Sequence, residues 1–190
     1  MSRAGAETRE RVIQSAKERM RRHGVEATSM LDAIADAGAS RGSLYHYFPG
    51  GKAQLIEEAT AAACEEYSAA FSLMESLDAA EAIPAMLDYW RTQVEATDFS
   101  AGCPVAAAAL SGGETEGARS KAGAGFTTWA ASIEKMLLTS GVPAARATTL
   151  ASLILSTIEG AVVVSLAQRS VEPMEQAAAE LLRIVDAARG

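Results

Sequence analysis

Apolar residues recur along most of the chain at intervals of three or four, the spacing of one face of an α-helix. In the first such segment, about residues 7–23, Val12, Ile13, Ala16 and Met20 share one face and arginines occupy the other. Gly24 then ends the predicted helix. Sustained alternation of apolar and polar residues, as a half-buried sheet requires, is absent from the sequence. The pattern therefore predicts an all-α protein.

Residues 29–48, SMLDAIADAGASRGSLYHYF, predict two short helices separated by a tight turn. Thr28 or Ser29 can cap the first of them, with Asp32 in the capping-box position three residues after Ser29. Ser40 caps the second, which Pro49-Gly50-Gly51 ends. The side chains expected to face the preceding helix are Leu31, Ile34 and Ala35.

This arrangement is typical of a helix-turn-helix, which places its second helix in the DNA major groove. Leu44 and Phe48 are expected to anchor that helix, whereas Arg41 can reach a guanine edge or a phosphate. Tyrosine hydroxyls and a lysine at a helix start suit phosphate oxygens. Each aromatic residue alone is equally consistent with an ordinary helix surface, but the combination favours DNA binding. The predicted DNA contacts are Thr28, Ser29, Ser40, Arg41, Gly42, Ser43, Tyr45, His46, Tyr47 and Lys52.

The remainder of the chain predicts further helices, at about residues 52–77, 80–97, 103–111, 118–139, 144–168 and 173–188. Residues 150–166 are apolar almost all round, so this helix should be buried on most sides, and residues 174–185 carry a single apolar stripe. The pair suggests a self-association surface; the alternative is that both helices cover this chain's own core. The residues assigned to a dimer interface are Leu155, Ile158, Val162, Ala178, Leu181, Leu182 and Val185.

Charge divides the chain in two. The net charge is −7, but residues 1–55 hold nine Lys or Arg against six Asp or Glu, whereas residues 56–190 hold eight against eighteen. A basic head on an acidic body can still bind phosphates, because salt screens the repulsion from the body over roughly 8 Å. The N-terminus lacks a secretory signal, and residues 150–166, which include Glu159, fall short of a membrane span. We therefore expect a cytoplasmic protein without a membrane partner.

A longer motif carries a family resemblance. The residues Ile34-Ala35-x-Ala37-Gly38-x-Ser40-x-Gly42-x-Leu44-Tyr45-x-x-Phe48, followed by Lys52 and Leu55, resemble the N-terminal domain of TetR-family transcriptional regulators over about residues 6–66. An extra residue before Lys52, together with Ala101-Gly102-Cys103-Pro104-Val105, resembles the LmrA/YxaF-type subgroup. Arg19 and Met20 replace the family's usual Leu-Phe pair, and Ala39 its usual valine. We expect these changes to trim the core of the head and lower its stability.

The resemblance implies an all-α fold with a three-helix DNA-binding domain at residues 1–51 and an effector-binding and dimerisation domain at residues 52–190. It further implies a homodimer that binds a palindromic DNA operator as a repressor and leaves it when a small apolar effector binds. Bulky and soft side chains are candidates for the effector pocket, although such residues are often plain core. The pocket candidates are Met86, Tyr89, Trp90, Cys103, Phe126, Trp129, Ile133 and Glu159.

Two of these residues leave alternatives open. Glu159 lies in the most apolar helix, where a carboxylate is costly unless partnered. It could bind a polar group of the effector, pair across a dimer, or mark a solvent-facing edge. Cys103 at a helix start could be a reactive thiol or an ordinary buried cysteine.

The sequence offers no catalytic constellation. The two histidines, His23 and His46, both lie in the head, and HExxH, GxSxG and zinc-binding cysteine spacings are absent. We therefore expect neither an enzyme, nor a cofactor, nor a bound metal. The alternative to a DNA-binding regulator is a helical ligand-binding protein whose head no longer binds DNA.

Overall fold

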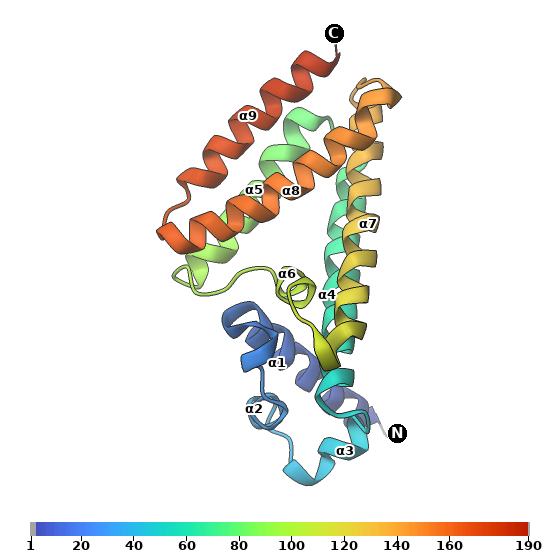
Figure 1. Cartoon of the computed structure of the whole chain (residues 1–190), viewed down its shortest axis with the longest axis vertical. Helices are drawn as coiled ribbons and strands as arrows, with labels where there is room; N and C mark the ends of the chain where they lie inside the picture. Colours follow the sequence, from blue (N-terminus) through green and yellow to red (C-terminus); the bar gives the residue numbers. More distant parts are fainter. Residues whose placement is uncertain (1–2, 190) are drawn as a thin grey trace. The chain divides into compact units, whose positions relative to one another are not determined.

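The computed structural model describes residues 3–189, with the backbone alone at residues 43 and 44. Within this range the protein is entirely helical, as predicted (Figure 1). The helices are α1 (Arg3–Ala27), α2 (Met30–Asp36), α3 (Leu44–Tyr47), α4 (Gly51–Met74), α5 (Ala79–Ala96), α6 (Pro104–Ala109), α7 (Glu116–Thr139), α8 (Ala144–Gln168) and α9 (Glu172–Arg189), with short 3-10 helices η1 (Arg41–Ser43) and η2 (Gly113–Thr115).

The chain packs as two compact units. The first contains the residues up to Glu66 together with Cys103–Gly125, and the second contains Tyr67–Gly102 together with the residues from Phe126 onward. Both boundaries fall inside helices, one in α4 and one in α7. Each of these two long helices therefore contributes one part of its length to each unit.

The core of the first unit forms around α1. Val12, Ile13, Ala16 and Met20 are all buried, so the apolar stripe predicted from the sequence is confirmed. Both α2 and α6 pack against α1. Gly24 has φ +76°, a left-handed conformation that favours glycine, and it produces the kink at the predicted end of the helix.

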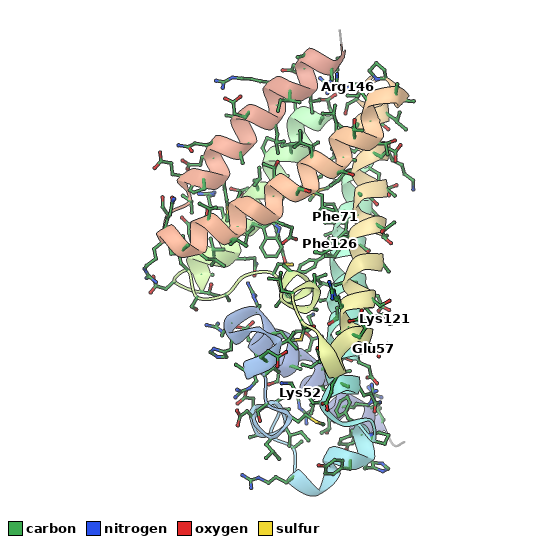
Figure 2. All side chains as sticks on the ribbon, in the orientation of Figure 1. Lys52, Glu57, Phe71, Lys121, Phe126 and Arg146 are labelled. Carbon is green, nitrogen blue, oxygen red and sulfur yellow. The ribbon has the colours of Figure 1, made fainter. Side chains whose placement is uncertain are left out.

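Helices α4 and α7 approach closely within the first unit. A Cβ atom at Gly117 of α7 would lie 2.5 Å from Glu57 Oε2 of α4, so this position requires glycine unless Glu57 moves. One turn further along α7, Lys121 Nζ lies 3.8 Å from Glu57 Oε1, and the two side chains are adjacent in Figure 2. Glycine at position 117 leaves room for Glu57, and the ion pair between Glu57 and Lys121 links the two helices.

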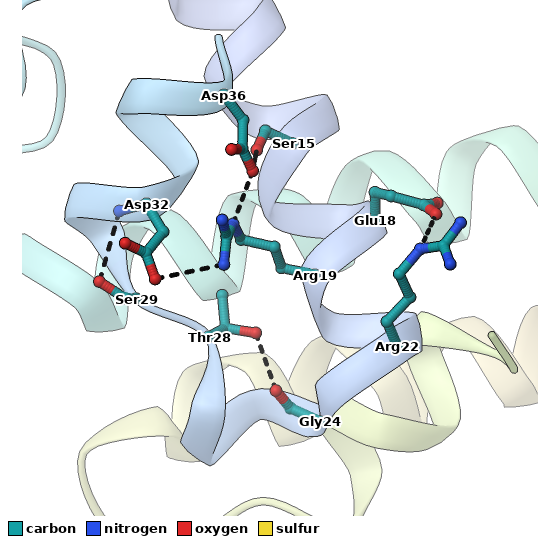
Figure 3. A network of polar contacts seen from close by, with 9 residues as sticks. All are labelled: Ser15, Glu18, Arg19, Arg22, Gly24, Thr28, Ser29, Asp32 and Asp36. Carbon is teal, nitrogen blue, oxygen red and sulfur yellow. Dashed lines mark hydrogen bonds and ion pairs between the residues drawn. The ribbon is translucent and has the colours of Figure 1, made fainter. Parts of the chain in front are cut away.

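A polar network joins α1 to α2 (Figure 3). Arg19 Nε donates to Asp36 Oδ2 at 2.7 Å, and its Nη1 donates to Asp32 Oδ2 at 3.2 Å. Ser15 also donates to Asp36. The Arg19 hydrogen bond holds the pKa of Asp36 below its ordinary value. Arg19 therefore replaces an apolar contact by ion pairs to both carboxylates, while Met20 stays buried.

This network sets which face of α2 is buried. Ala33 and Ile34 are fully buried against the rest of the unit, but Leu31 and Ala35 are exposed. The expectation that Leu31 and Ala35 face α1 was therefore wrong. Asp32 and Asp36, four residues apart, lie on the side held by Arg19, which turns Leu31 and Ala35 outward.

The turn after α2 has the hydrogen bonds of a Schellman motif. Ala39 N donates to Ile34 O and Gly38 N donates to Ala35 O, both at 3.0 Å. Gly38 has φ +66°, which a residue with a side chain adopts only with strain. At the other end of α2, Ser29 Oγ accepts a hydrogen bond from Asp32 N at 3.4 Å, so the predicted cap is confirmed.

The second unit is built from α5, α8 and α9, with the C-terminal part of α4 and of α7. Helix α8 packs against both α9 and α5, and α5 packs against α9 (Figure 1). By length and composition α8 is apolar enough to cross a membrane, but 44% of its most apolar stretch is buried inside the protein. Leu153, Val163 and Val164 remain exposed, so α8 is covered on one side only.

The Arg19 network makes a prediction about stability. Arg19→Ala should lower the free energy of unfolding at neutral pH by about 0.5–1 kcal/mol, because both carboxylates are partly exposed and solvent screens them. Since the pKa of Asp36 is lowered in the folded chain, the difference should be full above its ordinary value of 3.8 and shrink as the pH falls below it. Urea denaturation followed by far-UV circular dichroism measures both effects.

Arg22→Ala is the matched control. It removes the same charge, but Arg22 pairs with Glu18 inside the same helix. Equal losses for the two variants, or a difference that persists unchanged below pH 3.8, would contradict the role of Arg19 between α1 and α2.

Candidate DNA interface and ligand cavity

Phe48 anchors the predicted DNA-reading segment. Its side chain is fully buried, and the guanidinium of Arg9 lies over its ring, 5.0 Å from the centroid. Arg9 also pairs with Glu58 of α4, so α1 and α4 both hold this ring. The anchoring expected of Phe48 is therefore confirmed. The side chains of Leu44 and Ser43 lie outside the described part of the structure.

An open groove of about 590 Å³ crosses the first unit beside this segment. It brings together five of the predicted DNA contacts from three separate parts of the chain. Its lining includes Thr28, Ser29, Arg41, Tyr45 and Lys52. Exposed Leu31 contributes an apolar side chain to the same groove.

The residues of this groove differ in how many hydrogen bonds their side chains form within the chain. Tyr45 is 71% exposed, and neither it nor Arg41 forms a hydrogen bond or ion pair with another described residue. Lys52 Nζ donates to the carbonyl of Glu26 at 2.9 Å. An ammonium group has three donors, so Lys52 keeps two for another acceptor.

Thr28 and Ser29 have structural partners. The hydroxyl of Thr28 is buried and donates to the carbonyl of Gly24 at 2.8 Å (Figure 3). Ser29 is the N-cap of α2. Their side chains fix the start of α2, while the Ser29 oxygen and the first backbone N–H groups of the helix lie beside the groove.

The remaining predicted contacts lie on the short turn of η1 and α3. Ser40, Gly42 and His46 are exposed, and Tyr47 is half-buried with its ring centroid 5.5 Å from that of His46. A Cβ at Gly42 would meet only Ser40 Oγ, at 4.0 Å. Packing against the described side chains therefore does not require glycine here.

Ion pairs redistribute the positive charge of the head. Arg9, Lys17 and Arg19 pair with carboxylates of other helices, and Arg3, Arg21 and Arg22 pair within α1. The carboxylates on α4 that bind Arg9 and Lys17 lie beyond the basic segment recognised from the sequence. Three cations within residues 3–55 have no carboxylate partner: Arg11, which donates to the Ala37 carbonyl and to Thr8, and Arg41 and Lys52, which both line the groove.

An aromatic cavity of about 50 Å³ lies in the second unit. Tyr67 is central to it, with its ring 5.5 Å from Trp129, 5.6 Å from Trp90 and 6.2 Å from Tyr89. Phe71, labelled in Figure 2, stacks on Trp129 at 5.5 Å. Glu159 lines the same cavity, and its Oε2 atom is buried. The lining residues are Tyr67, Ala70, Phe71, Met74, Met86, Tyr89, Trp90, Trp129, Leu155, Ile158 and Glu159.

Five of the eight predicted pocket residues line this cavity, namely Met86, Tyr89, Trp90, Trp129 and Glu159. The other three are placed elsewhere. Phe126 packs edge-on against Trp129 behind the lining, and Ile133 is buried core. Cys103 belongs to the first unit, where its buried Sγ accepts a hydrogen bond from Ala106 N at 3.3 Å as the N-cap of α6.

Sequence reasoning missed the contribution of α4. Tyr67, Ala70, Phe71 and Met74 recur at intervals of three and four, a signal that was available, but α4 was read only as the helix following the DNA-binding head. Cys64 on the same helix is half-buried, and burial raises the pKa of its thiol to about 11. Among residues 3–189, no group of three or more His, Cys, Asp or Glu is placed to hold a metal ion.

The residues assigned to a dimer interface divide between two environments. Leu155, Ile158, Val162, Leu181 and Val185 are buried within this single chain, and Ala178 and Leu182 are half-buried. Leu155 and Ile158 line the aromatic cavity. The uncovered apolar surface lies beside them, in a groove along α8 and α9 that includes Leu153, Val164 and Ala177.

Comparison with known proteins follows the same division of the chain. Residues 12–59 match the family model for bacterial regulatory proteins of the tetR family, and residues 79–180 match the C-terminal domain of LmrA/YxaF-like transcriptional regulators. An HTH-type transcriptional regulator of Mycobacterium tuberculosis is 36% identical over 173 residues, which is 88% of each chain. The regulator LmrA of Bacillus subtilis is 30% identical and covers 88% of this chain and 91% of its own.

Solved structures share the fold. A TetR transcriptional regulator from Legionella pneumophila has a TM-score of 0.81 at 20% identity, covering 92% of this chain and 95% of its own. Reduced NemR of Escherichia coli has a TM-score of 0.72 at 22% identity, covering 93% and 97%. The matched family and relatives are transcriptional regulators and not enzymes. The chain belongs to the TetR family, with an N-terminal helix-turn-helix DNA-binding domain and a C-terminal domain of the LmrA/YxaF type.

Proposed function

We propose that this chain is a homodimeric repressor that occupies a palindromic operator and dissociates from it when a small, mostly apolar molecule enters the aromatic cavity. Its site of action would be the bacterial cytoplasm, where the DNA lies. TetR-family regulators bind DNA operators and dimerise. The observation that carries the proposal is the groove lined by Arg41, Tyr45 and Lys52. Of the polar groups on these three side chains, only the Lys52 ammonium forms a hydrogen bond within the described chain, so the rest are available to an external acceptor.

Each groove residue has a distinct proposed role. Arg41 reads a base edge, since a guanidinium can bond bidentately to a guanine. Tyr45 donates to a phosphate oxygen, and Lys52 binds a phosphate at the N-terminus of the 24-residue helix α4. Ser29 and the first N–H groups of α2 bind a second phosphate. Ser40, Gly42, His46 and Tyr47 border the same surface, and Thr28 acts by fixing the start of α2.

Helix α4 offers a route from effector to DNA. It is one continuous helix, with Lys52 in its first turn and Tyr67, Phe71 and Met74 lining the cavity further along. A ligand that changes the packing of those three side chains therefore acts on the same helix that bears the proposed phosphate contact. We expect a coupling of about 1–3 kcal/mol, which corresponds to a loss of operator affinity of roughly 5–150-fold.

The proposal is tested by selecting bound fragments from a genomic DNA pool at about 0.15 M salt, with the native chain and with Arg41→Ala in parallel. The native chain should enrich a palindrome, because two copies of the head present the same contacts to both half-sites. The variant should lose preference at specific positions, at a cost of about 1–3 kcal/mol per base contact. Arg22→Ala is the control, since Arg22 already pairs with Glu18.

Uniform weakening at all sites by Arg41→Ala would make Arg41 a phosphate contact. Failure of the folded native chain to enrich any sequence would reject the repressor and favour a ligand-binding protein with a DNA-inactive head.

Lys52→Ala should weaken binding to every sequence alike and reduce the dependence of affinity on salt by about one phosphate contact per head. The measurement is fluorescence anisotropy of the selected operator across a salt series. Lys135→Ala, which removes the same charge from α7 in the second unit, should leave the slope unchanged. An unaltered slope in Lys52→Ala would remove this lysine from the phosphate contacts.

The proposed dimer forms through the uncovered side of α8 and α9. Leu153→Glu should weaken self-association at least about tenfold, because the interface would then bury an unpaired carboxylate. Leu153 is 44% exposed in the single chain, so the fold should tolerate the change. Sedimentation equilibrium measures the effect, with Leu73→Glu on exposed α4 surface as the control. An undiminished dimer in Leu153→Glu would place the interface elsewhere.

A further inference from the structure

The aromatic cavity has an unusual charge distribution. Glu159 is its single Asp, Glu, Lys or Arg, and the other lining side chains are aromatic or aliphatic. We propose that the cavity recognises an organic cation, an alkylated ammonium group seated between the aromatic rings and the Glu159 carboxylate. The inference rests on the proposed function, since it names the chemical class of the effector that releases the chain from DNA.

The ring arrangement suits a cation. Tyr67, Tyr89, Trp90 and Trp129 come from three helices and lie within 5.5–6.2 Å of Tyr67 or of one another. Several of these contacts are edge-on, with Tyr67 at 83° to Trp129 and 78° to Tyr89. All four rings line the cavity, and the face of an aromatic ring attracts a cation that lies within about 6 Å of its centroid.

The carboxylate decides between ligand classes. Its Oε2 atom is buried beside apolar side chains, where the local dielectric strengthens electrostatic interactions. A bound cation would gain this attraction in addition to the ring faces, whereas an anion would be repelled. A neutral ligand would gain no such attraction. The lining therefore favours a cation over a neutral or anionic molecule of the same shape.

The volume limits the size of the recognised group. At about 50 Å³ the cavity exceeds the ~10–15 Å³ that admits one water, but it is far below the ~300 Å³ of sites that enclose a drug-sized molecule. It thus suits a compact head group. Tyr89 is 38% exposed, so the remainder of a longer molecule can leave the cavity beside this ring.

The two tryptophans of the chain, Trp90 and Trp129, both line the cavity, so intrinsic fluorescence reports its occupation directly. The probes are choline and its uncharged carbon analogue 3,3-dimethylbutan-1-ol, titrated into the full-length chain. Choline should quench or shift the fluorescence saturably and bind at least about tenfold more tightly than the alcohol, a difference that ring faces and a partly buried carboxylate together can supply.

Glu159→Gln should reduce choline affinity by about tenfold or more and change the affinity for the alcohol by less than about threefold. Glu95→Gln, which removes an exposed carboxylate from α5, should leave both affinities unchanged. Circular dichroism checks that each variant is folded. If Glu159→Gln does not fold, the comparison of the two probes on the native chain still decides the class.

Equal binding of the two probes, no saturable response to choline at up to about 10 mM, or an unchanged choline affinity in Glu159→Gln would overturn the inference. The proposed function fails separately. Release of the operator by neutral molecules but not by cations would leave the repressor intact and reject the ligand class. Absence of operator binding, with choline still bound in the cavity, would reject the repressor alone.

Discussion

Burial of Phe48 is the constraint on which the proposed DNA-reading surface depends. Helix α3 has only four residues, too few for a helix to be stable by itself. Its position is therefore set by tertiary contacts, with Phe48 buried at its end and Arg9 over the ring. Tyr45, three residues earlier, is 71% exposed. The segment thus combines one buried anchoring side chain with an exposed tyrosine.

The distribution of positive charge in the first unit depends more on which cations form ion pairs than on how many there are. The sequence has an excess of positive charge in its first 55 residues, yet most of those cations bind carboxylates, and some of the carboxylates belong to α4. Such pairs contribute little energy each when exposed, but they fix the helices on which they lie. Apart from Arg11, the cations of this segment without a carboxylate partner are Arg41 and Lys52, and both line the same groove.

Helix α4 connects two kinds of chemistry that the chain otherwise keeps in separate units. Its first turn carries Lys52, and its later turns carry Tyr67 and Phe71 against Trp129. The aromatic side chains can change their packing at the cavity. The helix that bears them is stiff, because backbone hydrogen bonds run the whole length of α4. In the proposed mechanism, this helix is the element through which a ligand in the cavity acts on the head.

The sequence by itself determined the all-α fold, the helix boundaries and the family, because helical periodicity, capping residues and turn glycines such as Gly38 are local signals. It also singled out Glu159, which lines the aromatic cavity. Only the tertiary structure decided which side of each helix is covered: Leu31 faces outward because Arg19 holds the opposite side of α2, and Leu155 faces the cavity instead of a free surface. A helix that is apolar all round, like α8, carries no pattern from which its buried side can be chosen, so that choice belongs to its neighbours.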